Sequence, residues 1–170
     1  MINPFAKKYT PKEYSIFQFL SSIPVFAALQ NDEMVKFFPY MHERTYVQNE
    51  CVFLRDDPSL AMYIVKKGEV TLSIDINELT EELKVVRGGH AIGKSCLLKG
   101  VKRQVNAIVT SEKAEFYVIP QMNFFDVFEH NPKIELKIMK ALAKEYSDFN
   151  AHLFKSYRKY YGIFELRHLY

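Results

Sequence analysis

The chain has 170 residues, of which 48% are hydrophobic and 25% charged, and its formal net charge is +3. This length fits one domain, and this composition excludes a disordered chain and predicts a packed interior. The net charge falls well short of the dense basic surface of a dedicated nucleic-acid-binding protein, so charge alone names no partner.

The residues that could carry metal or nucleophilic chemistry are scattered. Cys51 and Cys96 form no CxxC motif, and the five histidines show neither HxH nor HExxH spacing, so we expect no disulfide framework, no zinc and no cupin-type metal site. Ser95 and Cys96 lack a GxSxG turn and a positioned His/Asp partner. The sequence therefore predicts a protein that is not an enzyme and has no resident cofactor, and its cysteine usage favours the reducing cytoplasm.

Membrane insertion and secretion are not expected either. The opening residues 1–10 (MINPFAKKYT) lack the apolar core of a signal peptide. No apolar run approaches the roughly 20 residues that a spanning helix needs. We therefore expect a soluble protein without a membrane partner.

The first 42 residues are predicted to be helical. Residues 10–13 (TPKE) combine a capping box with proline at the first helical position, which predicts a helix over Pro11–Ser21. A second start at Asn31, followed by two acidic residues that suit the positive end of the helix dipole, predicts a helix over Met34–Met41.

Residues 43–120 change character and predict a mainly β body. Short segments rich in β-branched and aromatic residues alternate with Asn, Asp, Gly and Pro. Asn49 and Gly68 lie at turns where a positive φ is expected, and residues 56–58 (DDP) mark another reversal. This spacing predicts an antiparallel β jelly roll with flanking helices. The segments are RTYVQNECVFLR, AMYIVKKGEVTLSIDI, ELKVVRGG, RQVNAIVTS and AEFYVIP.

Residues 121–170 are predicted to form C-terminal helices of the same domain. From Pro132 an apolar stripe recurs every three or four positions, and Gly162 is the first plausible break. At about 1.5 Å per residue the helix would be about 40 Å long, longer than a small domain is wide. The stripe either packs on the barrel or, where the helix projects, pairs with its copy in a homodimer. Its members are Leu136, Met139, Ala143, Tyr146, Phe149, Leu153, Tyr157 and Tyr160.

Three motifs carry a family resemblance. Residues 62–70 contain MYIV and GEV, Gly89 enters the next strand, and residues 92–98 (IGKSCLL) lead without a gap to Arg103. In these motifs the chain resembles the cyclic nucleotide-binding domain of catabolite-activator-type regulators, protein kinase A regulatory subunits and cyclic-nucleotide-gated channels. The similarity covers roughly Ile23 to the C-terminal helix. Residues 93–103, within the loop 88–107, match the phosphate cassette of that family and are called the cassette below.

The resemblance implies a ligand site in the cassette. In the family, an arginine pairs with the cyclic phosphate, a glutamate accepts a hydrogen bond from the ribose 2'-hydroxyl, and amides at a helix start complete the cradle. It therefore implies a small phosphorylated ligand, such as the cyclic nucleotides cAMP or cGMP. Leu97 matches the buried cassette leucine, and the side chain of Cys96 is expected to pack in the core. The ligand-binding positions are Gly93, Lys94, Ser95, Cys96, Arg103 and Gln104.

Two departures affect this expectation. Lys94 stands where the family has its ribose-binding glutamate, and Gln104-Val105 replaces a pair of small residues. Lysine has three donors and no acceptor, so it cannot replace the carboxylate, a loss of about 1.5 to 3 kcal/mol. Lys94 either makes the pocket more cationic together with Arg103, which favours a ligand of higher negative charge, or turns outward into solvent.

Plainer roles remain open for the other candidates. Arg103 also fits a surface run with two lysines, and His90 in a glycine-flanked turn is more often solvated than ligand-bound. In relatives the C-terminal helix covers the pocket and stacks on the base. Tyr146, Phe149 and Tyr157 could make that contact, although aromatics at helical spacing more often belong to a core.

The sequence thus predicts a stand-alone regulatory sensor domain whose output is movement of its C-terminal helix toward an unknown protein partner. One alternative is a dimerisation or interaction scaffold that has lost its ligand. The other is a catabolite-activator-type transcription regulator without its DNA-binding domain. Too few residues follow Tyr160 for a helix-turn-helix, so direct sequence-specific DNA binding is not expected.

Overall fold

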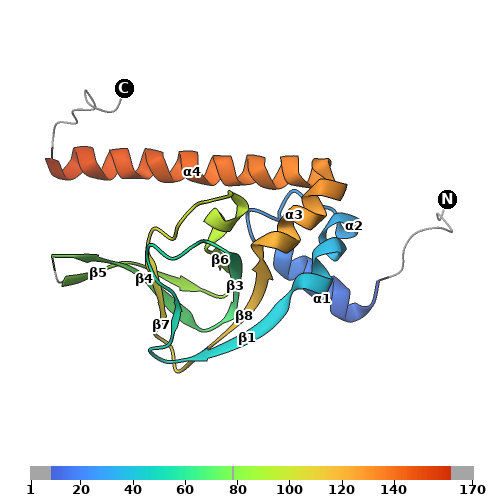
Figure 1. Cartoon of the computed structure of the whole chain (residues 1–170), viewed down its shortest axis with the longest axis horizontal. Helices are drawn as coiled ribbons and strands as arrows, with labels where there is room; N and C mark the ends of the chain where they lie inside the picture. The colour runs from blue at the N-terminus through green and yellow to red at the C-terminus, as the bar shows by residue number, and fades with distance from the viewer. Residues whose placement is uncertain (1–8, 78, 162–170) are drawn as a thin grey trace.

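The structure is a computed structural model that describes residues 9–77 and 79–161 (Figure 1). Helices and strands follow in the order that the sequence predicts, with the strands between two helical segments. The helical elements are α1 (Pro11–Ser21), α2 (Asn31–Met34), η1 (Val35–Tyr40), η2 (Lys94–Leu97), α3 (Gln121–His130) and α4 (Pro132–Tyr161). The strands are β1 (His42–Val47), β2 (Cys51–Phe53), β3 (Ala61–Lys67), β4 (Glu69–Ile76), β5 (Leu79–Arg87), β6 (His90–Ile92), β7 (Asn106–Val109) and β8 (Lys113–Pro120).

The strands form two four-stranded antiparallel sheets, in the orders β1-β8-β3-β6 and β2-β7-β4-β5. The chain passes from one sheet to the other between β1 and β2, which is the connectivity of a jelly roll. Asn49 and Gly68 have φ of 68° and 90°, and Asp56 in the reversal before β3 has φ of 68°. The predicted jelly roll with flanking helices is confirmed.

Two apolar clusters hold the molecule together, one on each face of the sheet β1-β8-β3-β6. Strand β8 shows why, because its side chains alternate between the faces. Phe116 packs between the two sheets, whereas Ile119 packs with the helices. The helical cluster also includes Cys96 and Leu97 of η2, so the cassette is anchored to the same core as the helices.

The N-terminal helices confirm one prediction and correct another. Helix α1 spans Pro11–Ser21 with the capping box between Thr10 and Glu13. The second helix does not run over Met34–Met41. It begins after Gln30, whose backbone N–H donates to Glu33 at 2.8 Å, and gives way after Met34 to a 3-10 helix that contains Pro39. Proline cannot donate the hydrogen bond that a continued α-helix needs.

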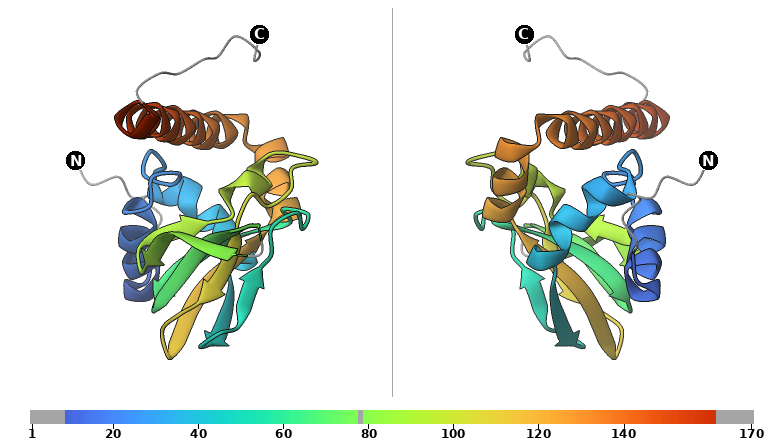
Figure 2. Two further views of the ribbon diagram at one scale, coloured as in Figure 1. Left: turned by 90° about the vertical axis from the view of Figure 1, so that its left-hand side faces the viewer. Right: turned by 90° about the vertical axis from the view of Figure 1, so that its right-hand side faces the viewer.

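Helix α4 has 30 residues and extends across one end of the β body, which it overlies in all three views (Figures 1 and 2). Its buried face is Ile134, Ile138 and Leu142. The predicted stripe is a different face, since Leu136 is 55% and Phe149 is 63% exposed. Of the two alternatives for this stripe, packing on the body holds for Met139, which is partly buried against the helical core, whereas homodimer pairing of the exposed members stays a prediction. Gly162, the expected break, lies outside the described residues.

Candidate functional site

The cassette begins with a turn that only glycine suits. Gly93 follows strand β6 and has φ of 70°, in the left-handed region. A Cβ atom at this position would lie 2.2 Å from Nη1 of Arg103 and 3.1 Å from the carbonyl oxygen of Ala61. Both the backbone conformation and the close approach of the guanidinium therefore require glycine.

Arg103 points inward. Its side chain is buried, with only 3% of the residue exposed. Nη1 donates to the carbonyl of Gly93 at 3.0 Å, and Nη2 donates to the carbonyl of Ala61 at 2.7 Å. The guanidinium carbon also lies 4.1 Å from the ring centre of Phe53, a cation–π contact. Arg103 is therefore not a surface residue, the other interpretation of its sequence context. Its side chain joins the cassette to strand β3.

The charge of Arg103 has no partner of opposite sign in the part of the chain that the structure describes. Among the described residues, no carboxylate lies within ion-pair distance of its guanidinium, and its Nε is buried without a hydrogen-bond acceptor. Burial lowers the pKa of Arg103, but a guanidinium stays protonated in proteins. A buried charge without a counter-charge is energetically unfavourable. The site is thus electrostatically suited to an anion.

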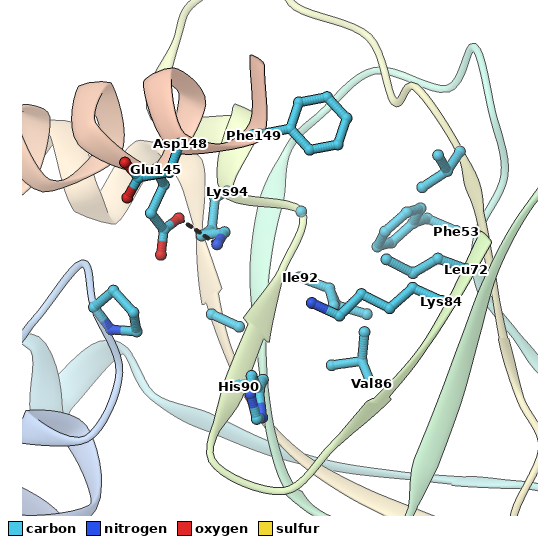
Figure 3. Close-up of a pocket in the computed structure, with 14 residues that line it drawn as sticks. Phe53, Leu72, Lys84, Val86, His90, Ile92, Lys94, Glu145, Asp148 and Phe149 are labelled. Carbon is cyan, nitrogen blue, oxygen red and sulfur yellow. Dashed lines mark hydrogen bonds and ion pairs between the residues drawn. The ribbon is translucent and has the colours of Figure 1, made fainter. Parts of the chain in front are cut away.

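Lys94 follows neither of the two predicted alternatives. It is neither turned outward nor a free cation beside Arg103, because its Nζ forms an ion pair with Oε2 of Glu145 on α4 (Figure 3). The two side chains are 30% and 23% exposed. The lysine charge is therefore compensated locally, which removes the reason to expect a ligand of higher negative charge.

The middle of the cassette is firmly packed. Ser95 and Ser59 share a hydrogen bond of 2.8 Å between their hydroxyls. Cys96 is fully buried, its backbone N–H donates to the carbonyl of Gly93, and burial raises the pKa of its thiol to about 12. The thiol therefore belongs to the core, as expected for that side chain. Nε2 of Gln121 donates to the carbonyls of Cys96 and Leu98 at 2.5 and 3.2 Å, which fixes η2 to the start of α3.

The two residues after Arg103 leave the pocket open. Gln104 is exposed, and its Nε2 donates to the carbonyl of Lys102 at 3.1 Å. Val105 is half-buried and packs against the inter-sheet core. Both residues line the pocket, which has a volume of about 350 Å³ with Gln104 and Val105 in place.

A pocket of about 350 Å³, called the Arg103 pocket, lies between the cassette, the sheet β2-β7-β4-β5 and α4. Its polar lining includes Lys94, Ser95, Arg103 and Glu145. An adjoining hollow of about 450 Å³ reaches Lys84 and His90 past the Lys94–Glu145 ion pair (Figure 3). The apolar walls of the Arg103 pocket are Phe53, Leu72, Val105, Leu142, Tyr146 and Phe149.

The structure brings five of the six predicted positions to the Arg103 pocket, namely Gly93, Lys94, Ser95, Arg103 and Gln104, and adds residues that the sequence did not reveal. The sixth, Cys96, does not line the pocket, because its side chain is buried in the helical core. Tyr146 and Phe149 line the Arg103 pocket, whereas Tyr157 is not among its lining residues. His90 is exposed and borders only the adjoining hollow. Glu145 was missed because its partner Lys94 lies 51 residues away. The assignment of these residues to a ligand stays a prediction.

Other kinds of site were searched for within the same described ranges. No group of three or more His, Cys, Asp or Glu side chains in residues 9–77 and 79–161 could hold a metal ion. In that part of the chain, no helix combines the length and the apolar character needed to cross a membrane. Arg103 and its pocket are therefore the strongest candidate site.

Comparison with known proteins gives a family match and several likenesses. Residues 43–131, just over half of the chain, match the family model described as cyclic nucleotide-binding domain. The chain is 23% identical over 141 residues to the cAMP-dependent protein kinase type II regulatory subunit of Drosophila melanogaster, which covers 82% of this chain and 36% of that protein. The chain spans at most 36% of the length of the curated relatives it matches.

Two solved structures illustrate the shared fold. A cyclic nucleotide-binding domain from Methylobacillus flagellatus has a TM-score of 0.71 at 20% identity, with 91% of this chain and 86% of that chain covered. The regulatory domain of Toxoplasma gondii PKA, crystallised with cAMP, has a TM-score of 0.64 at 21% identity, with 71% of this chain and 46% of that chain covered. At sequence identities of 20% and 21%, the structural similarity shows that the fold is shared and nothing more specific.

Proposed function

Because the chain belongs to the cyclic nucleotide-binding domain family, we propose that it binds a cyclic nucleotide in the Arg103 pocket and signals the bound state through α4. The observation that carries the proposal is the buried charge of Arg103, which has no carboxylate partner in residues 9–77 and 79–161. A ligand phosphate would supply that partner. No chemical step on the ligand is involved.

The charges of the pocket favour a monoanion. Lys94 and Glu145 cancel each other, which leaves the single positive charge of Arg103. A cyclic phosphodiester carries one negative charge, as in cAMP and cGMP, and would therefore neutralise the pocket. The volume of about 350 Å³ is within the range of about 300 to 1,000 Å³ that is typical of small-molecule pockets. The apolar walls suit the base and sugar of such a ligand.

Helix α4 is the part of the protein through which binding would be relayed. Leu142, Tyr146 and Phe149 of this helix line the Arg103 pocket. A ligand that contacts them differently in two positions of α4 shifts the population between those positions. The aromatic side chains of Tyr146 and Phe149 are the candidates for contact with the base.

The partner of the second half of α4 is proposed to be a second copy of the chain. Beyond Glu145 all described side chains of the helix are exposed, including Phe149 at 63% and Leu153 at 51%. Apolar side chains that recur along an exposed helix suit antiparallel or parallel pairing with an identical helix. A dimer would bring the two Arg103 pockets to a shared helical interface.

The decisive experiment compares Arg103→Met with Arg87→Met. Arg87 is an exposed arginine that pairs with Glu69 and does not border the pocket, so it controls for the loss of one charge. We expect the wild-type protein and Arg87→Met to bind cAMP or cGMP in isothermal titration calorimetry, and Arg103→Met to bind about tenfold to a hundredfold more weakly, as for one lost charge-assisted hydrogen bond.

Thermal unfolding shows whether each variant is folded, and Arg103→Lys provides a second, charge-retaining test. Lysine keeps the positive charge but loses the forked donor geometry, so an intermediate affinity is expected. If the wild-type protein gives neither heat nor a thermal shift with any cyclic nucleotide, the proposal is wrong. A dimerisation or interaction scaffold would then be the better description.

A further inference from the structure

Helix α4 is attached to the body at three successive places. Ile134, Ile138 and Leu142 are buried in the helical core. Lys137 donates to both carboxylate oxygens of Glu33 at 2.6 and 2.8 Å. The ion pair between Lys94 and Glu145 is the most C-terminal of these three, and the residues from 146 to 159 that follow it are exposed.

This third attachment lies at the pocket itself. Lys94 and Glu145 both line the Arg103 pocket and the adjoining hollow, so the two spaces share their ion pair, which Figure 3 shows within the adjoining hollow. Lys94 directly follows Gly93, whose carbonyl accepts from the guanidinium of Arg103. The ion pair therefore joins the anion-binding segment to the helix near the point where the buried face of the helix ends at Leu142.

An anion beside Arg103 would disturb this ion pair in two ways. It would attract Lys94, whose ammonium group is a compact charge on a flexible stem and can turn toward a new acceptor. It would also repel the carboxylate of Glu145, since like charges in a partly buried site interact unfavourably. Both effects oppose the contact between the cassette and α4.

We propose that the Lys94–Glu145 ion pair is a latch that holds α4 against the cassette in the empty protein, and that an anionic ligand opens it by taking Lys94 from Glu145. The competition between the ligand and Glu145 for Lys94 rests on the proposed function. The ion pair as a latch in the empty protein does not. Removal of the Glu145 charge should therefore loosen α4 without ligand and strengthen ligand binding.

The first test needs no ligand and compares Glu145→Gln with Asp148→Asn. Asp148 is on the same helix and borders the adjoining hollow, but its ion pair is with Lys144 on the helix surface. Hydrogen exchange of the amides in residues 142–150 should be about two- to fivefold faster in Glu145→Gln, the factor for loss of a partly exposed ion pair, and nearly unchanged in Asp148→Asn. The charge-swapped double variant Lys94→Glu/Glu145→Lys should restore slow exchange.

Exchange that is equally fast in both single variants, or unchanged in Glu145→Gln, overturns the latch whether or not a ligand binds. Lys94→Glu alone places two carboxylates face to face and should speed exchange further. A slower exchange in that variant would also contradict the latch.

The second test adds cAMP and cGMP to the wild-type protein and to Glu145→Gln. The competition predicts that Glu145→Gln binds the ligand about two- to fivefold more tightly than the wild-type protein, because the ligand no longer competes with Glu145 for Lys94. Weaker binding by Glu145→Gln would show that the carboxylate assists the ligand, and would overturn the competition. If no variant binds, the proposed function fails, and the exchange without ligand still decides whether the latch exists.

Discussion

The two halves of α4 have similar apolar sequences and opposite environments. Ile138 in the first half is fully buried, whereas Phe149 and Leu153 in the second half are more than half exposed. The first half lies over α3 and the N-terminal helices, which provide an apolar surface for it (Figure 2). Helical periodicity identifies an apolar face, but only the elements opposite that face decide whether it is a core or an interface.

The transition between the halves coincides with the pocket. Leu142 is the last buried residue of α4, and it lines the Arg103 pocket together with Glu145 and Tyr146. The proposed ligand site therefore adjoins the place where α4 changes from a buried to an exposed helix. Under the proposed function, a change at the pocket would act on the exposed half of α4.

The largest expected effect tests the buried half. Ile138→Ala should lower the free energy of unfolding by about 2 to 5 kcal/mol, because it leaves a cavity in the helical core. Leu136→Ala, two residues earlier on the exposed face, should change it by no more than about 0.5 kcal/mol. Urea unfolding followed by circular dichroism measures both. An equal loss in the two variants would show that the exposed face is covered in solution.

That pair of residues also shows where sequence reasoning succeeded and failed. The capping box of α1 was predictable because its signal is local. The face of α4 was not, since Ile138 and Leu136 are equally apolar and differ only in what the folded chain places opposite them. The jelly roll itself was predictable because short segments rich in β-branched and aromatic residues alternate with turn residues along the chain.

In the candidate site, too, the features carried by one segment of sequence were predicted and the contacts between distant segments were not. Gly93 and Arg103 were predicted because the continuous segment that contains both resembles the phosphate cassette of the family. The acceptors of the guanidinium were not, because the carbonyl of Ala61 comes from a strand 42 residues away. The partner of Lys94 was missed for the same reason, and with it the net charge of the pocket.

An intermediate effect is expected in the exposed half. Leu153→Asp should weaken the proposed dimer at least about tenfold, because a carboxylate in an apolar interface loses its hydration. Ala151→Asp adds the same charge to the opposite side of the helix and should leave the dimer intact. Sedimentation velocity over a range of concentrations measures this. A wild-type protein that stays monomeric throughout would contradict the interface.

The smallest expected effect concerns the ion pair that ties the first half of α4 to α2. Burial opposes ionisation of Glu33, but the hydrogen bonds from Lys137 and from the backbone of Gln30 outweigh it and lower the pKa of this carboxyl. A carboxyl whose pKa is lower in the folded state stabilises the protein above its unfolded pKa, about 4.3, and this stabilisation is lost as the pH falls through the folded value.

Glu33→Gln tests this linkage, because glutamine can still accept the capping hydrogen bond while the charge is removed. We expect the variant to be less stable than the wild-type protein by up to about 1 kcal/mol near pH 7, and the difference to vanish in acid. Asp32→Asn controls for the loss of one negative charge at the start of α2. Urea unfolding between pH 7 and pH 3 measures the difference. A gap that persists in acid would mean that Glu33 acts through packing, and the first half of α4 would then owe its attachment to apolar contacts alone.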